Sequence, residues 1–342
     1  MTVLSLRETL ETVVSGHHLT EPQAEHFLSE VLKGNVSEIS LSSFLTALKM
    51  KGETREELSG FVRGMRNHAV KPTAKFDFDF IDTCGTGGDG KGSLNVSTLS
   101  ALTLASLGVP VAKHGNRSVS SLSGSSDVLA AVGYSLEKSP DESVDEFLKK
   151  GFVFLFAPSW HPAMKYAGPV RKELGFRTFF NLIGPLSNPF FPTHQIVGVY
   201  HKSLTSPICE ILRGLGAKKA IVCHSQDGLD EFSIFSTTNY TYFTGNSTEE
   251  LGFDPSVLRL REEELDPRSV FSDSKEGAIA LFRSVLSGEK PSAGLSMVAL
   301  NAGVALFLFG RVSGIEEGYL VARDAILSKK VQQFARETLN LT

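Results

Sequence analysis

The sequence is poor in cysteine, in tryptophan and in net charge. Among its 342 residues there are three cysteines and one tryptophan, and 34 Lys+Arg against 38 Asp+Glu leave a formal net charge of −4. An odd number of cysteines, no two of which are separated by only two residues, predicts neither a disulfide framework nor a zinc–thiolate site and favours a reducing compartment. The slightly acidic balance argues against a general nucleic-acid binder, which normally carries a basic excess.

The sequence also shows no pattern typical of a targeting segment or of a membrane-spanning segment. The N-terminal stretch has acidic residues at Glu8 and Glu11 and lacks the basic-then-apolar layout of a signal peptide. The longest apolar stretch, Met297 to Phe309, contains Asn301 and is shorter than the roughly 18–20 residues that cross a bilayer. We therefore expect a cytoplasmic protein with neither a membrane span nor a lipid anchor.

The residues that are present predict an N-terminal helical block. With 41% hydrophobic and 21% charged residues, the chain has an ordinary globular composition, and its length suggests about two domains. In residues 1 to about 70, apolar residues recur at helical spacing, and Thr20 and Thr54 stand at N-cap positions. Pro72 ends the block. These four short helices are too few to make a large domain alone.

From residue 76 onward, strand and helix patterns alternate along the chain. We expect strands at 76–81, 109–113, 152–157, 196–200 and 219–223, and helices at 97–107, 126–132, 142–150 and 204–214. The last 70 residues are expected to be mainly helical. This alternation predicts an α/β fold in which helices cover the faces of a parallel sheet.

The segment 82–127 holds most of the candidate chemistry. Between Asp89 and Asp127 it contains no acidic residue, although it includes Lys113 and Arg117 and many glycines and hydroxyl groups. Such a basic run inside an acidic protein indicates an anion site. A plain surface loop is the alternative.

Local structure supports the anion site. We expect Gly85–Gly88 to bring backbone amides close to a ligand. Helices that begin near Ser97 and at Ser125 would direct their free amides and positive dipole ends at phosphate groups. Several such devices in one segment predict a ligand with more than one phosphate.

Two common motifs nearly match the same segment. Gly85, Gly87 and Gly90 spell GxGxxG after a strand, but the acidic residue that an NAD site needs about 20 positions later is missing. Gly85, Gly90 and Lys91 fit a P-loop, but Gly92 stands where Ser or Thr should bind magnesium. Both an NAD oxidoreductase and an ATPase are disfavoured.

The ordered motifs resemble the anthranilate phosphoribosyltransferase family over essentially the whole chain. They are GTGGD at 85–89, NxST at 95–98, KHGNRSVSS at 113–121, VRKELGFRTxFNxxGPLxNP at 170–189 and LDEFS at 229–233. The resemblance implies that the phosphoribosyl group of phosphoribosyl pyrophosphate is transferred to the amine of anthranilate, with release of pyrophosphate, in tryptophan biosynthesis.

The resemblance also implies an architecture like that of the nucleoside phosphorylases. A small all-helical domain would span 1–71 and be completed by about 165–186. A larger α/β domain with a mainly parallel central sheet would span 72–342. A homodimer that associates through the helical domain is implied, with no nucleic-acid or membrane partner.

Residue roles follow from the same resemblance. Those implied to contact phosphoribosyl pyrophosphate are Gly85, Gly88, Asp89, Ser93, Asn95, Val96, Ser97, Thr98, Lys113, His114, Gly115, Asn116, Arg117, Ser118, Val119, Ser120, Ser121 and Ser125. Those implied for anthranilate are Gly85, Asn116 and Arg171, and those for Mg²⁺, with two ions expected, are Ser97, Asp230 and Glu231. We expect no general base, because the neutral aromatic amine of anthranilate is already a nucleophile.

Other interpretations stay open at the level of the sequence. A non-catalytic nucleic-acid-binding relative and a nucleoside phosphorylase are the alternative functions on this fold. Without the resemblance, the pair Asp230–Glu231 is typical of a solvated turn and Arg171 of a surface charge. His114 could be a buried packing residue, His161 could either line the anthranilate tunnel or pack, and no function is attached to Cys84.

Overall fold

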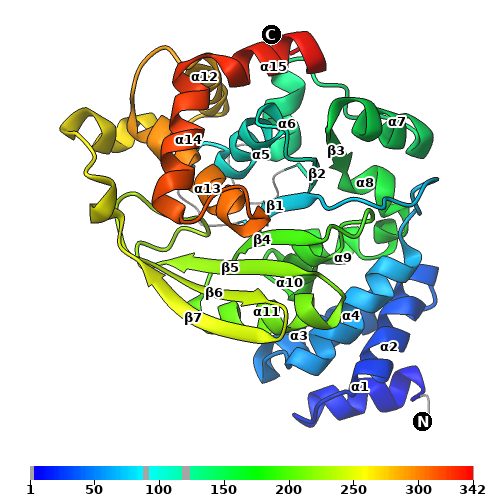
Figure 1. Cartoon of the computed structure of the whole chain (residues 1–342). Helices are drawn as coiled ribbons and strands as arrows, with labels where there is room; N and C mark the ends of the chain where they lie inside the picture. Colours follow the sequence, from blue (N-terminus) through cyan, green and yellow to red (C-terminus); the bar gives the residue numbers. More distant parts are fainter. Residues whose placement is uncertain (1–3, 88–91, 118–123, 342) are drawn as a thin grey trace. The chain divides into compact units, whose positions relative to one another are not determined.

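The chain divides into two compact units (Figure 1). The computed structural model describes residues 4–87, 92–117 and 124–341. The helical unit contains Met1–Lys71 and Ala157–Pro189, and the α/β unit contains Pro72–Phe156 and Phe190–Thr342. The returning segment of the helical unit is thus longer than the predicted range of about 165–186.

The helical unit begins with the four helices that the sequence predicts. Its helices are α1 (Leu6–Val14), α2 (Glu21–Lys33), α3 (Glu38–Lys51), α4 (Arg55–His68), α8 (Ala157–Trp160), α9 (Gly168–Leu174) and α10 (Phe179–Leu186). Thr54 caps α4 and forms a capping box with Glu57, which satisfies two of the amides that a helix start leaves over. Thr20 is the N-cap residue of α2, as predicted, and its backbone amide donates to Gln23 Oε1 at 2.9 Å.

Glu57 joins three segments of this unit, although its carboxylate is fully buried. One carboxylate oxygen accepts from the backbone amide of Leu19 at 2.9 Å. The other accepts from the amide of Thr54 at 2.9 Å and from Lys51 Nζ at 2.8 Å. The buried charge is therefore paired and hydrogen-bonded, which is the condition under which such a group is tolerated in an interior.

The α/β unit is built on a seven-stranded sheet in the order β3-β2-β1-β4-β5-β6-β7, among the residues described. The strands are β1 (Ile81–Gly85), β2 (Val111–Gly115), β3 (Phe152–Phe156), β4 (His194–Gly198), β5 (Lys219–Ser225), β6 (Thr238–Thr244) and β7 (Ser247–Phe253). The first five in this order pair in parallel, and β6 and β7 are antiparallel. The sheet is mainly parallel, which confirms the prediction.

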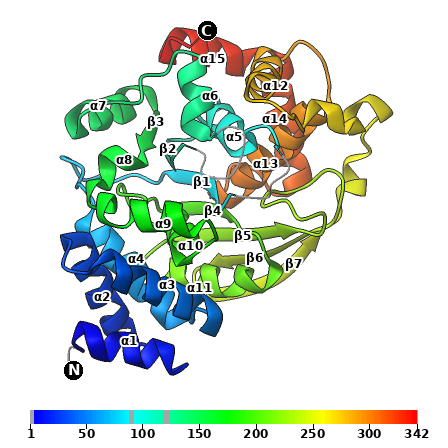
Figure 2. The same ribbon diagram turned by 180° about the vertical axis from the view of Figure 1, so that it is seen from behind.

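Helices cover the sheet on both sides. They are α5 (Val96–Ser106), α6 (Ser125–Ala131), α7 (Pro140–Lys150), α11 (Thr205–Gly214), α12 (Lys275–Ser287), α13 (Ala293–Phe309), α14 (Ile315–Leu327) and α15 (Lys330–Leu339). Figures 1 and 2 show α5 and α13 on one face of the sheet and α11 on the other. The predicted helical C-terminal part is confirmed.

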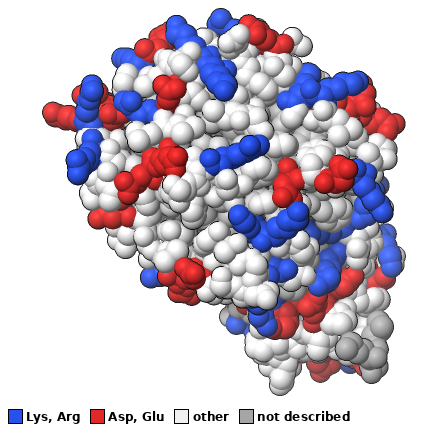
Figure 3. Space-filling view, in the orientation of Figure 1, with Lys and Arg blue, Asp and Glu red and all other residues white. Residues whose placement is uncertain are grey.

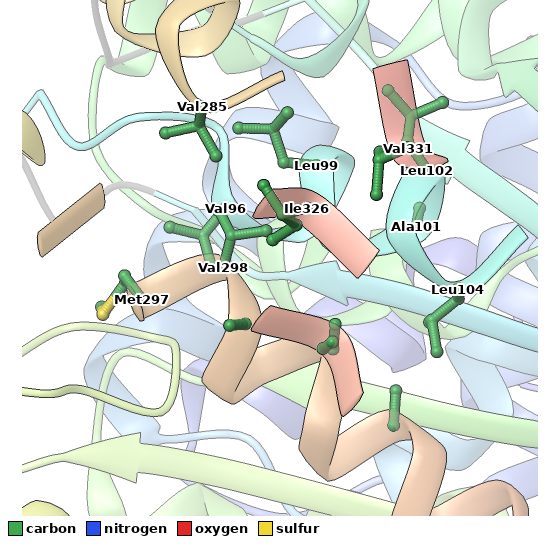
Figure 4. Close-up of a cluster of buried hydrophobic side chains, with 14 of the residues drawn as sticks. Val96, Leu99, Ala101, Leu102, Leu104, Val285, Met297, Val298, Ile326 and Val331 are labelled. Carbon is green, nitrogen blue, oxygen red and sulfur yellow. The ribbon is translucent and has the colours of Figure 1, made fainter. Parts of the chain in front are cut away.

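The largest core lies between α5 and the C-terminal helices. In Figure 4, Val96 and Leu99 of α5 lie near Val298 of α13 and Ile326 of α14, and Leu102 of α5 lies beside Val331 of α15. From Thr98 to Ser106 every residue of α5 is buried, so this helix has no polar outer face. A helix enclosed in this way has a closely fixed position, and its first turn is correspondingly well placed.

One expectation about strands is wrong, and one hairpin was missed. Residues 76–80 form no strand; β1 begins only at Ile81. The alternating pattern at 76–80 instead arises because Phe76 packs against the rings of Phe147 and Phe190, at centroid distances of 5.1 and 4.9 Å. The hairpin β6–β7 was not predicted, and it adds an antiparallel edge to the sheet.

No helix in the described part of the chain combines the length and the apolar character that a bilayer crossing requires.

Candidate functional site

The carboxyl ends of four neighbouring parallel strands carry the candidate site. Strands β1, β2 and β4 end in Gly85, Gly115 and Gly198, and the loop after β5 leads to Asp230. In open α/β sheets, ligands bind beyond these carboxyl ends. The residues from Gly85 to Ser125 and the pair Asp230–Glu231, far apart in the sequence, all belong to the α/β unit.

Asp230 lies directly against the ends of β1 and β4. A Cβ placed on Gly85 would overlap the Asp230 carboxylate, and one placed on Gly198 would overlap the Asp230 carbonyl group. The backbone amide of Gly87 donates to Asp230 Oδ2 at 2.8 Å. Glycine at the end of β1 leaves room for the Asp230 carboxylate, and glycine at the end of β4 leaves room for the Asp230 backbone. Asp230 is 7% exposed.

This arrangement shows what the first glycines of the loop contact within the protein, and their predicted contact with a ligand stays a prediction. We expected Gly85–Gly88 to bring the backbone close to a ligand and to point amides at it. Within the described residues, the space beside Gly85 is filled by Asp230, and the amide of Gly87 binds the same side chain. The glycines therefore accommodate a protein carboxylate at the edge of the site.

Lys113 brings a buried positive charge to the same edge. Its side chain is 1% exposed, and Nζ donates to the carbonyl oxygen of Thr83 at 2.5 Å and to Ser97 Oγ at 3.1 Å. Burial lowers the pKa of Lys113, while the nearby carboxylates of Asp82 and Glu231 oppose that shift. Lys113 thus links β1, β2 and the start of α5, and its predicted contact with phosphate stays a prediction.

The helix start at α5 holds the predicted hydroxyl groups. Asn95 takes the N-cap position, Val96 begins the helix, and Ser97 accepts the bond from Lys113. The hydroxyl of Thr83 donates to the carbonyl oxygen of Ser97 at 3.0 Å, which ties the first turn to β1. Thr98 Oγ1 is buried and has no hydrogen-bond partner among the described residues.

A second cluster forms where β2 meets α6. The carbonyl oxygen of Asn116 accepts from Ser125 Oγ at 3.4 Å, and Gly115 leaves room for that serine. Arg117 is exposed, and its guanidinium lies 5.7 Å from the ring centre of Phe156. The predicted helix start at Ser125 is confirmed, although α6 has only seven residues.

The other predicted residues of the α/β unit lie around these groups. Ser93 forms an isolated antiparallel bridge with Phe271. His114 is buried, and its backbone amide donates to Asp82 Oδ1 at 3.2 Å. Glu231 is half-buried. Burial raises the pKa of the Cys223 thiol, and the charges of Asp230 and Glu231 add to that shift, which places both carboxylates near the end of β5.

Some predicted residues lie outside the described part of the chain. They are Gly88, Asp89, Ser118, Val119, Ser120 and Ser121.

Arg171 and His161 belong to the helical unit. Arg171 is on α9, 5.0 Å from the ring centre of Phe180, and burial lowers its pKa. Burial also lowers the pKa of His161 to about 4, so this histidine is neutral at pH 7. Its burial agrees with the packing interpretation of His161.

Sequence reasoning missed Thr83 and Gly198. Gly198 lies within the VGVY stretch at 197–200, and its sequence context is that of an ordinary strand residue. Thr83 lies inside β1. A glycine at the carboxyl end of a buried strand is the signal that could have revealed the close approach of Asp230.

Comparison with known proteins gives matches over both units. The α/β domain model of the glycosyl transferase family matches residues 77–330, and the helical bundle domain model of that family matches residues 7–69. The chain is 40% identical over 331 residues to the anthranilate phosphoribosyltransferase of Geobacillus sp. (strain WCH70), covering 96% of each. It is 43% identical over 324 residues to that of Geobacillus kaustophilus (strain HTA426), covering 95% of this chain and 94% of the relative.

Solved structures of the same kind are also similar. Anthranilate phosphoribosyltransferase from Thermus thermophilus has a TM-score of 0.88 at 35% identity, covering 97% of this chain and 98% of that one. The Saccharomyces cerevisiae protein of that name, solved in complex with PRPP and Mg, has a TM-score of 0.85 at 26% identity, covering 98% and 97%.

The packing of Asp230 on Gly198 predicts that Gly198→Ala is destabilising. The added methyl group would force the Asp230 backbone away from β4, and overpacking of this kind costs about 1–3 kcal/mol of unfolding free energy. Gly214→Ala is the matched control, because a Cβ there meets nothing within 4 Å and Ala favours the α11 helix. Urea unfolding of both variants checks this, and equal stabilities would contradict the packing account.

Proposed function

The chain belongs to the anthranilate phosphoribosyltransferases of the glycosyl transferase family, and we propose that the site on its α/β unit performs the reaction of that family. The phosphoribosyl group of phosphoribosyl pyrophosphate passes to the amine of anthranilate, giving N-(5-phosphoribosyl)anthranilate and pyrophosphate. The observation that carries the assignment of the site is the meeting of Asp230, Lys113 and the start of α5 at one edge of the sheet.

The start of α5 supports phosphate binding. Helix N-termini attract phosphate through free amides and the positive end of the dipole. The buried Thr98 hydroxyl lies in this first turn, and Lys113 adds a positive charge through its bond to Ser97. We propose that Ser97 and Thr98 bind phosphate oxygens, and that Lys113 orients Ser97 and contributes positive charge.

Magnesium suits the carboxylates at this edge. Asp230, Glu231 and the hydroxyl of Ser97 are hard oxygen donors, the class that Mg²⁺ prefers. No three His, Cys, Asp or Glu side chains gather into a metal site within the described ranges. Mg²⁺ commonly takes one or two carboxylates together with substrate phosphates, and such a site needs no complete protein cage. Mg²⁺, when bound, neutralises the charge of the departing pyrophosphate.

The protein's own contribution is positioning and electrostatics. The bond from the anomeric carbon of the ribose to pyrophosphate breaks and leaves positive charge on the ribose. The amine of anthranilate forms its bond to the same carbon and then loses a proton to the released pyrophosphate or to water. Because this amine is neutral and nucleophilic, no side chain is assigned as general base. The glycine contacts fix Asp230, and the enclosed helix α5 fixes Ser97 and Thr98. Because these polar groups are already in place, they need little rearrangement during the reaction.

Finer features of the family remain proposals for this chain. The first of these proposals is the binding of two Mg²⁺ ions, and the adjacent carboxylates of Asp230 and Glu231 support it. A homodimer through the helical unit and a cytoplasmic location are the others. The face shown in Figure 3 carries Lys/Arg and Asp/Glu side chains interspersed, which favours a small-molecule enzyme over a nucleic-acid-binding relative.

Turnover should require anthranilate, phosphoribosyl pyrophosphate and Mg²⁺ together, measured as the loss of anthranilate fluorescence. Asp230→Ala combined with Glu231→Ala should abolish Mg²⁺-dependent turnover, because both proposed carboxylate ligands are removed. The control is Glu249→Ala with Glu250→Ala, an exposed adjacent pair on β7 that changes the net charge equally. Full activity in the Asp230/Glu231 variant would refute the metal assignment.

Arg171→Ala should mainly raise the KM for anthranilate, by about tenfold or more, because a guanidinium can hold a carboxylate through two charge-assisted hydrogen bonds. The KM for phosphoribosyl pyrophosphate should change little. Lys172→Ala, an exposed neighbour on the same helix, is the control. An unchanged anthranilate KM in Arg171→Ala would remove this role from Arg171.

A further inference from the structure

The segment that carries Ser93 and Asn95 is paired with a distant part of the chain. The amide of Leu94 donates to the carbonyl oxygen of Val270 at 2.7 Å, and the amide of Ser272 donates to that of Gly92 at 3.0 Å. Between these bonds, Ser93 faces Phe271 in an antiparallel bridge. We call residues 262–274 the clasp. Its pairing fixes the stretch of chain that leads into α5.

The clasp has little regular structure of its own. It contains two short 3₁₀ turns, Glu262–Leu265 and Pro267–Ser269. Turns of this length do not hold a fixed position by themselves, so the clasp needs anchors in the surrounding helices.

Glu264 provides the main anchor, and its side chain is buried at 3% exposure. Its Oε1 accepts from Nε and Nη2 of Arg323 on α14, at 3.2 and 3.1 Å. The same oxygen accepts from Ser296 Oγ on α13 at 3.1 Å. Neighbouring Glu262 and Glu263 are exposed, so Glu264 is the one buried residue of this run of three glutamates.

A second anchor joins the clasp to the start of α13. The amide of Gly294 donates to Ser269 Oγ at 3.1 Å, and a Cβ at Gly294 would overlap the Ser269 carbonyl oxygen. The same helix packs along α5, where Val298 contacts the group of side chains that includes Val96 and Leu99 (Figure 4). The helix α5 and the clasp are thus held by one pair of helices, α13 and α14.

We propose that the ion pair between the buried Glu264 and the half-buried Arg323 positions the phosphate-binding segment through the clasp. The proposal rests on the proposed function. Without Arg323, the carboxylate of Glu264 would be left charged, buried and without its cation, so the clasp would shift to bring it to water. Without the Glu264 charge, Arg323, whose side chain is 26% exposed, would no longer hold the clasp on α14. That shift would loosen the pairing at Gly92 and Leu94 and displace Ser93, Asn95 and the first turn of α5. Arg171, proposed for anthranilate, lies in the other unit and is not part of this connection.

The test uses Glu264→Gln and Arg323→Met, with Arg323→Lys as the conservative variant. Each of the first two should raise the KM for phosphoribosyl pyrophosphate, and its calorimetric Kd with Mg²⁺, roughly tenfold, the range expected for substitutions that act through intermediate residues. The KM for anthranilate should stay within about twofold. Arg323→Lys should fall between these variants and the unchanged protein. The double variant should be no worse than the worse single variant, because the two residues act as one unit.

Lys138→Met is the matched control. It breaks the ion pair of Lys138 with Glu146, which is also largely buried in the α/β unit but joins the loop before α7 to α7 itself. This variant should lower the melting temperature without changing the KM for phosphoribosyl pyrophosphate. All assays are run below the lowest melting temperature of the set.

Amide hydrogen exchange at Leu94 and Ser272 gives a readout that is independent of turnover. It should accelerate in Glu264→Gln and Arg323→Met and remain unchanged in Lys138→Met. Unchanged exchange at these amides would overturn the proposal. It would also be overturned if Glu264→Gln and Arg323→Met lose stability as Lys138→Met does but keep the same KM and Kd for phosphoribosyl pyrophosphate. If the unchanged protein shows no turnover and no binding, the proposed function fails. Hydrogen exchange then decides alone whether the ion pair controls the clasp.

Discussion

The site depends on the contact between Asp230 and the glycine ends of two parallel strands. A side chain at the end of β1 would displace the Asp230 carboxylate, and one at the end of β4 would displace the Asp230 backbone. The amide of Gly87 donates to the carboxylate and fixes its orientation. On the neighbouring strand, the buried ammonium of Lys113 faces the start of α5. Negative and positive groups are thus separated at one edge of the sheet. A metal ion with a pyrophosphate needs both kinds of group within a short distance.

The sequence predicted the order of elements better than their limits. The runs in β3, β4 and β5 and the starts of α5 and α6 were visible because buried parallel strands are almost continuously apolar and because small polar residues precede the helices. The strand predicted over 76–80 was wrong, because rings that pack in an aromatic cluster produce the same alternation of apolar and polar residues as a strand. In the hairpin β6–β7, Gly245-Asn246 is a turn signal, but the exposed Glu249 and Glu250 hide the second strand.

Residues of the site could be found from the sequence, but their physical partners could not. The motif at 85–89 implies close approach to a glycine backbone without revealing whether a ligand or a protein group makes that approach. The partner, Asp230, lies 143 positions along the chain from Gly87. The bond from Lys113 to Ser97 needs the pairing of β2 with β1, and the clasp needs the folded C-terminal helices. Such contacts follow from the tertiary structure and have no local sequence pattern.

The central claim is that the carboxylate of Asp230, which lies against Gly85 and accepts from the Gly87 amide, is the metal-binding end of the phosphoribosyl pyrophosphate site. Crystals grown with phosphoribosyl pyrophosphate and Mn²⁺, measured at the manganese absorption edge, test it directly. The account predicts an anomalous peak at coordination distance from Asp230 or Glu231, with the pyrophosphate group on the other side of the ion. Manganese bound only elsewhere, with the sugar phosphate in place and Asp230 still on the Gly87 amide, would contradict it.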